Sequence, residues 1–79
     1  MDTYIATFFS HFGAIRFHKK LEEQNIEAVL MPVPRKVSSS CGTCVKFTAD
    51  SIEEYNSQDI DSLYHMEEDG TISLIFSNL

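Results

Sequence analysis

Two cysteines three positions apart, Cys41 and Cys44, are the residues of this chain best suited to covalent chemistry. The ionised form of a cysteine thiol is a strong nucleophile. On a straight strand, residues three apart point to opposite faces, so the two thiols can meet only if the chain turns between them. Gly42 lies in that interval and has the backbone freedom to make a turn. We therefore predict Cys41 in a loop and Cys44 at the start of a strand.

These cysteines lie in the one net-basic stretch of an acidic chain. The 79 residues carry a net charge of −6, and all eight charged residues from position 47 onward are acidic. Arg35 and Lys36 precede Cys41 by six and five positions. If the intervening loop folds back, their positive charge would favour the thiolate of Cys41. The net acidic charge argues against binding to nucleic acids or to anionic membranes.

Two other interpretations of the cysteines stay open at this point. Unpaired cysteines often behave as small buried hydrophobic residues, and such cysteines would be incidental to function. A metal site is the second alternative, but zinc usually requires four ligands, and the chain has no second cysteine pair. Its histidines, His11, His18 and His65, show no ligand spacing. A dimer could pool two cysteine pairs, so the metal-binding alternative remains, although we predict no metal.

Residue patterns predict a single domain, 1–79, in which strands and helices alternate. Runs rich in β-branched and aromatic residues predict strands at 3–9, 26–31, 44–49 and 71–76. The order β-α-β, long loop, β-α-β is that of the ferredoxin-like split βαβ fold. We therefore predict an α+β domain with a four-stranded antiparallel sheet and two helices on one face.

Both predicted helices begin at a serine that can cap the first turn. Ser10 precedes the first helix, which should end at Asn25 and bury Phe12, Ile15 and Leu21. Ser51 and Glu54 form a capping box for the second helix. That helix should bury one broad apolar face, made of Ile52, Tyr55, Ile60, Leu63 and Tyr64.

The first, second and last predicted strands are apolar on both faces. A two-layer domain would leave one face of such a sheet bare, and exposed apolar patches usually mark interfaces. We therefore predict a homodimer packed through the open sheet face. No secretory signal or membrane-spanning run is apparent, which favours the cytoplasm, where thiols stay reduced. In that compartment a lone cysteine pair indicates redox, metal or carrier chemistry.

The loop between the second and third predicted strands carries a resemblance to a known family. It reads Pro32-Val33-Pro34-Arg35, then Val37-Ser38-Ser39-Ser40-Cys41-Gly42. An opening strand runs through Ser10 into a helix, and Ile26-Glu27-Ala28 leads to the loop. Over residues 3–49 the chain resembles the Se/S carrier protein-like family, a small bacterial family of unknown function.

The resemblance implies a cytosolic carrier that holds sulfur or selenium on Cys41 as a persulfide or selenosulfide, with no separate cofactor. Arg35 and Ser40 would be neighbours of the bound anion, beside the turn at Gly42. The chain departs from the family at Cys44, where a non-cysteine residue is usual. A thiol at that position could attack a persulfide on Cys41, release sulfide and close a disulfide.

The prediction from the whole sequence is a small thiol protein, a carrier or redox adaptor rather than a turnover enzyme. Cys41 is the predicted nucleophile and Cys44 the predicted resolving thiol. Arg35, Ser40 and Gly42 are the predicted substrate-binding residues, and a sulfur or selenium donor or acceptor protein is the expected partner. The alternatives are a dimeric interaction module whose cysteines are incidental, and a metal-binding module.

Overall fold

The first half of the chain forms a strand, a helix and two further strands, in the predicted order. The computed structural model describes residues 1–37, 39–51 and 58–78. Its elements are β1 Asp2–Phe8, α1 His11–Glu23, β2 Ala28–Pro32, β3 Thr43–Ala49, β4 Ile60–Met66 and β5 Ile72–Ser77. The strands predicted at 3–9, 26–31, 44–49 and 71–76 are each confirmed to within two residues.

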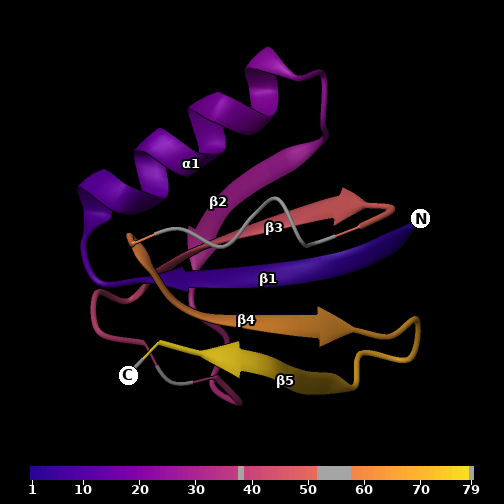
Figure 1. The fold of residues 1–79 in the computed structure, drawn as a ribbon. Coiled ribbons are helices and arrows are strands. Elements are labelled where there is room, and N and C mark those ends of the chain that lie inside the picture. Colours follow the sequence, from indigo (N-terminus) through magenta and orange to yellow (C-terminus); the bar gives the residue numbers. More distant parts are fainter. Residues whose placement is uncertain (38, 52–57, 79) are drawn as a thin grey trace.

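All strands lie in one sheet with the order β2-β3-β1-β4-β5, and each adjacent pair is antiparallel. β1 and β2 are therefore parallel to one another, with β3 inserted between them. α1 connects these two strands and lies against one face of the sheet, as Figure 1 shows. This arrangement brings the start of α1 to the same end of the sheet as the start of β3.

The predicted sheet of four strands with two helices is wrong. The described residues form five strands and one helix. Ile60, Leu63 and Tyr64, predicted to lie on the second helix, belong to β4 instead. Ile52 and Tyr55, which complete that predicted helical face, lie outside the described residues.

A β-bulge at the start of β4 accounts for the helix-like spacing. Thr7 pairs with Ser62, but the next residue, Phe8, pairs with Ile60, so the register shifts by one residue. The bulge leaves Asp61 as the extra residue of β4. Ile60 and the residue three positions later, Leu63, both reach the same buried cluster. Two core residues three apart are usual on a helix, and on a strand they require such an irregularity.

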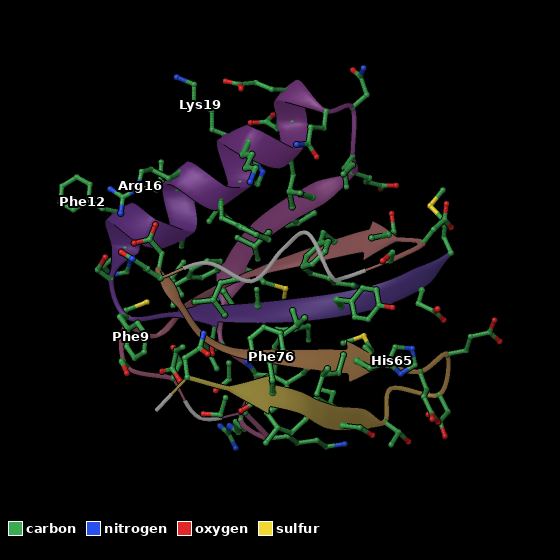
Figure 2. The ribbon with its side chains drawn as sticks, in the orientation of Figure 1. Phe9, Phe12, Arg16, Lys19, His65 and Phe76 are labelled. Atoms are coloured by element: carbon green, nitrogen blue, oxygen red, sulfur yellow. The ribbon has the colours of Figure 1, made fainter. Side chains whose placement is uncertain are left out.

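α1 begins and ends at the predicted residues but buries a different face. The hydroxyl of Ser10 accepts a hydrogen bond from the Gly13 N–H at 3.2 Å, and Asn25 has a φ of 60° just beyond the end of the helix. Phe12 and Ile15, predicted to be buried, are 73 % and 52 % exposed. Figure 2 shows Phe12 pointing away from the sheet. The buried residues of the helix are Gly13, Ala14, Phe17 and Leu21.

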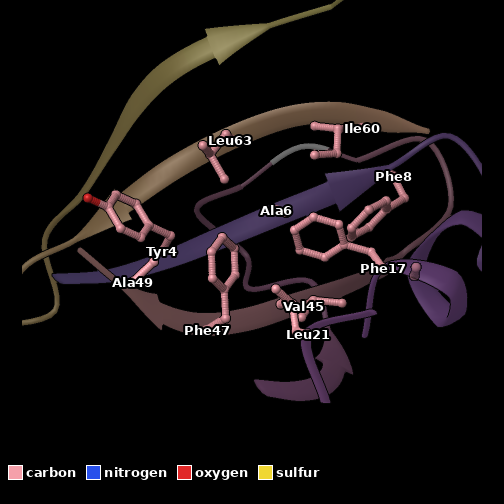
Figure 3. Close-up of a cluster of buried hydrophobic side chains, with 11 residues drawn as sticks. Tyr4, Ala6, Phe8, Phe17, Leu21, Val45, Phe47, Ala49, Ile60 and Leu63 are labelled. Carbon is pink, nitrogen blue, oxygen red and sulfur yellow. The ribbon is translucent and has the colours of Figure 1, made fainter. Parts of the chain in front are cut away.

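Aromatic side chains from α1 and from the sheet make up much of the core. The ring of Phe17 lies 5.3 Å from Phe8 and 5.4 Å from Phe47, measured between centroids. Tyr4 lies 5.7 Å from Phe47 on the neighbouring strand. Figure 3 shows these rings gathered between the helix and strands β1 and β3. The predicted face of the third strand, made of Val45, Phe47 and Ala49, is confirmed as buried.

The opposite face of the sheet is partly covered. Ile5 and Thr7 lie on that face and are fully buried. Ser39 and Ser40, in the loop between β2 and β3, line a groove on this side together with Tyr64 and Leu74, and Ser40 bonds to Asp61 of β4. Val29 and Leu74, toward the two edges, are exposed. Apolar residues on both faces therefore do not by themselves require a second copy, and the homodimer stays a prediction.

Gly13 lies close to Asp59, just before β4. A Cβ atom added there would lie 2.8 Å from the Cβ of Asp59, whose carboxylate pairs with Arg16 at 2.8 Å. Because that contact is too short, Gly13→Ala should push the helix away from Asp59. Overpacking costs about 1–3 kcal/mol, and the better helix propensity of alanine returns about 1 kcal/mol of it. We expect a net loss of about 1 kcal/mol in the free energy of unfolding, measured by urea denaturation.

Ile15→Ala is the matched control because it lies two positions along the same helix but is half exposed. Its free energy of unfolding should change by less than about 0.5 kcal/mol. A Gly13→Ala protein as stable as the wild type would show that Asp59 can move aside without cost.

Candidate functional site

The cysteine segment forms a tight return at the end of the loop between β2 and β3. Gly42 has a φ of +76°, a left-handed conformation that favours glycine. Its carbonyl accepts a hydrogen bond from Val33 N at 3.1 Å, which closes the two ends of the loop on one another. The prediction that Cys41 lies in the loop and Cys44 at the entrance of a strand is confirmed.

The two thiols are free, and they differ in burial and in hydrogen bonding. Cys41 is half-buried, and its thiol donates to the Thr43 carbonyl at 3.4 Å. Cys44 is 0 % exposed, and its thiol donates to the Pro32 carbonyl at 3.7 Å. Because each sulfur is directed to a different carbonyl, the structure is that of a reduced dithiol in which only Cys41 reaches solvent.

Burial also separates the two cysteines chemically. Burial first, and then a negative charge on the nearby Cys41, together raise the pKa of the Cys44 thiol from 9.0 to about 11. At neutral pH Cys44 is therefore a neutral thiol, the weakly nucleophilic form. The resolving role predicted for Cys44 requires its thiolate, which this environment disfavours.

His11 joins the start of α1 to the cysteine turn. Its Nδ1 is hydrogen bonded to the Thr43 hydroxyl at 2.8 Å, and the Thr43 carbonyl is the acceptor for the Cys41 thiol. In the sequence His11 has no ligand spacing with another histidine, so no role was predicted for it. Only the packing of α1 against the sheet places this imidazole beside the turn.

Asp61 is the second residue of the site that was not predicted from the sequence. It is 2 % exposed, and its carboxylate accepts hydrogen bonds from the N–H of Ser40 at 3.2 Å and from the Ser40 hydroxyl at 2.8 Å. The hydroxyl of Ser62 donates to its other oxygen at 3.0 Å. A carboxylate between Ile60 and Leu63, two residues predicted to be buried, was the available signal, since a buried carboxylate needs partners.

The three predicted substrate-binding residues are placed differently. Gly42 makes the predicted turn. Ser40 directs its hydroxyl to Asp61. Arg35 is exposed in the turn closed by the hydrogen bond from Val37 N to the Pro34 carbonyl, and its side chain forms no ion pair with the described residues. Ser38, the first residue of the predicted serine run, lies outside the described residues.

In the part of the chain that the structure describes, no three His, Cys, Asp or Glu side chains come together as a group that could hold a metal ion. No helix in the same part is long and apolar enough to span a membrane.

The comparison with protein families gives one match. Residues 3–58 match the model of the family described as "Putative Se/S carrier protein-like". The chain belongs to this family. The matched region includes Arg35, Ser40, Cys41 and Cys44, and it ends before Asp61. Comparison with curated proteins and with solved structures gives no match.

Proposed function

We propose that this Se/S carrier-like protein carries sulfur or selenium on Cys41. The observation that supports the proposal is the inequality of the two thiols. Cys41 reaches solvent, whereas Cys44 is buried, donates its proton to a carbonyl and has a raised pKa. A carrier needs one accessible nucleophile and gains from having no competing thiol in its ionised form.

The loading step is an exchange with a donor persulfide. The Cys41 thiolate attacks the outer sulfur of the donor, a new S–S bond forms, and the S–S bond of the donor breaks. The donor leaves as a thiolate with the electron pair of that bond, and Cys41 becomes a persulfide. A donor that carries selenium in the outer position would leave a selenosulfide on Cys41 by the same exchange. Transfer to an acceptor thiol is the reverse of this step.

Cys44 limits how long the bound sulfur is held. Its thiolate could attack the inner sulfur of the persulfide on Cys41, so that a disulfide closes and hydrosulfide leaves. Burial and the high pKa of Cys44 slow this reaction at neutral pH. This is the difference from a redox adaptor, in which the disulfide between the two cysteines would form readily. The cytoplasm, where thiols stay reduced, suits the carrier.

The surrounding residues have separate parts in this proposal. Gly42 provides the turn that brings Cys41 to the surface. The hydrogen bond from the Ser40 N–H to Asp61 holds the backbone just before Cys41. Arg35 is an exposed cation on the same loop, and in this proposal it binds an anionic donor. The predicted homodimer would contain two such carriers, each with its own Cys41.

The test is the mass of the intact protein after incubation with glutathione persulfide. The wild type and the Cys44→Ser variant should each gain one sulfur atom on Cys41, and the Cys41→Ser variant should gain none. Cys44→Ser is the matched control because it removes the other thiol of the same segment. A wild type that gains no sulfur, or a Cys41→Ser variant that gains as much as the wild type, would rule out Cys41 as the carrier residue.

A further inference from the structure

The carboxylate of Asp61 attaches the loop that carries Cys41 to the sheet, at the last residue of the loop before Cys41. Ser40 precedes Cys41 directly, and both its N–H and its hydroxyl donate to Asp61 Oδ2. Hydrogen bonds to a charged group are about twice as strong as those between neutral groups. The backbone of the residue next to the nucleophile is therefore held by two such bonds from β4.

The position of this carboxylate depends on the bulge. Asp61 is the extra residue of β4, opposite the point where the register of β1 shifts between Thr7 and Phe8. Bulges are frequent beside functional sites, where they redirect a side chain. A regular strand would alternate strictly between the helix-covered face and the other face. The irregularity lets Asp61 be buried and still reach the loop.

Hydrogen bonds to Asp61 attach Ser40 to the sheet, next to Cys41, whose side chain packs against the core. A groove of about 430 Å³ is lined by Ser39 and Ser40 of the loop and by residues of the sheet. The sheet residues that line it are Asp61, Ser62, Tyr64, Leu74 and Ser77. The Cys41 N–H donates to the Ser39 hydroxyl at 3.4 Å, a bond within the loop that does not attach it to the sheet. Loss of the Asp61 bonds would therefore remove the hydrogen bonds that attach Ser40 to the sheet and loosen the turn on that side.

We infer that Asp61 is a positioning residue that keeps Cys41 directed away from Cys44. The inference rests on the proposed function and deepens it, because a loosened turn would bring the loaded sulfur of Cys41 within reach of Cys44. The Cys44 thiolate would then attack the inner sulfur, its proton would go to solvent, and hydrosulfide would leave with the electron pair of the broken S–S bond. Asp61 touches neither sulfur and acts only through Ser40.

The test compares the lifetime of the loaded sulfur in Asp61→Asn with that in the wild type, both loaded with glutathione persulfide. Asparagine keeps the shape of aspartate and an oxygen that can accept from Ser40, but it removes the charge that strengthens both bonds. We expect loading to the same extent and hydrosulfide release about tenfold faster, the factor that corresponds to replacing hydrogen bonds to a charged group by bonds to a neutral one. A disulfide between Cys41 and Cys44 should appear at the same rate.

The double variant Asp61→Asn, Cys44→Ser separates positioning from a general loss of structure. It should hold its sulfur as long as Cys44→Ser alone, because the attacking thiol is gone. Tyr4→Leu is the stability control, since it removes a buried ring contact with Phe47 that lies along β1 away from the pairing of Thr7 with Cys44. Tyr4→Leu should release sulfur at the wild-type rate. Release at the wild-type rate from a folded Asp61→Asn protein would overturn the inference.

Two additional measurements keep the inference testable. If Asp61→Asn does not fold, Ser40→Ala removes the shorter of the two bonds from an exposed loop residue and should also speed release. If the wild type takes up no sulfur, the proposed function fails, but the positioning role is measured by disulfide closure. Glutathione disulfide forms a mixed disulfide on Cys41, which Cys44 resolves with release of glutathione. An unchanged closure rate in Asp61→Asn would then reject the role of Asp61.

Discussion

Cys44 should react with iodoacetamide at least about 100-fold more slowly in the folded protein at neutral pH than in the chain unfolded by urea. The thiolate is the reacting form, and a rise of two pKa units, from 9.0 to about 11, lowers its population at neutral pH by about that factor. Peptide mapping of the alkylated protein gives the two rates. Cys41, which is half-buried and near the surface, provides the internal comparison.

The same shift predicts how stability depends on pH. Because the folded pKa of Cys44 is raised above its unfolded value, the folded state favours the protonated thiol. The contribution to stability is fully present below about pH 9 and is lost as pH rises through about 11. Two pKa units correspond to roughly 2–3 kcal/mol. The measurement is the free energy of unfolding of the wild type relative to Cys44→Ala at pH 8 and at pH 11, since that comparison cancels other groups that titrate in the range.

Alkylation of Cys44 as fast as that of Cys41 at neutral pH would contradict both the predicted slow reaction of Cys44 and the predicted pH dependence of stability. It would mean that the start of β3 opens readily to solvent and that Cys44 is available as a resolving thiol. The protein would then act as a redox adaptor rather than as a carrier. The reactivity of this one thiol therefore distinguishes the two functions that the sequence left open.

Phe47→Ala should cause the largest loss of stability among single substitutions in the core. Phe47 is 1 % exposed and packs its ring against Tyr4 and Phe17. Replacing a buried phenylalanine by alanine costs about 3–5 kcal/mol through lost contacts and the cavity left behind. Small domains have a total stability of about 5–15 kcal/mol, so this variant should be close to unfolding at 37 °C. Urea denaturation followed by circular dichroism gives the value.

Phe12→Ala is the control because it is the same substitution at a residue that points into solvent. Its free energy of unfolding should stay within about 0.5 kcal/mol of the wild type. Similar losses for the two variants would mean that α1 buries the face containing Phe12, as the helical spacing of Phe12 and Ile15 had suggested.

Local signals in the sequence located most of the elements. Runs of β-branched and aromatic residues marked four of the strands, and Ser10 and Asn25 marked the ends of α1. These signals succeed because capping, left-handed turns and strand preference depend on a few neighbouring residues. Gly42 was identified as the turn of the cysteine segment for the same reason.

The errors arose where a local pattern has two structural solutions. Ile60, Leu63 and Tyr64 have helical spacing, but a bulge allows Ile60 and Leu63 to share one face of a strand. Phe12 and Ile15 match a buried helical face as well as Phe17 and Leu21 do. Phe17 and Leu21 pack against the sheet because Gly13 and Ala14 on the same side of the helix are small enough for close packing. The sequence pattern alone does not decide between helix and strand at 60–64, or between the two faces of α1, because both depend on the surface that packs against them.

By itself, the sequence determined the cysteine pair, the glycine turn between them, the net-basic surroundings and the resemblance to the Se/S carrier-like family. These depend on residue type and spacing along the chain. The tertiary structure decided which cysteine is accessible, since burial depends on what packs around β3. It also brought His11 to Thr43 and Asp61 to Ser40, pairs separated by 32 and 21 residues. Contacts at such separations follow from strand register and the bulge, which no local pattern encodes.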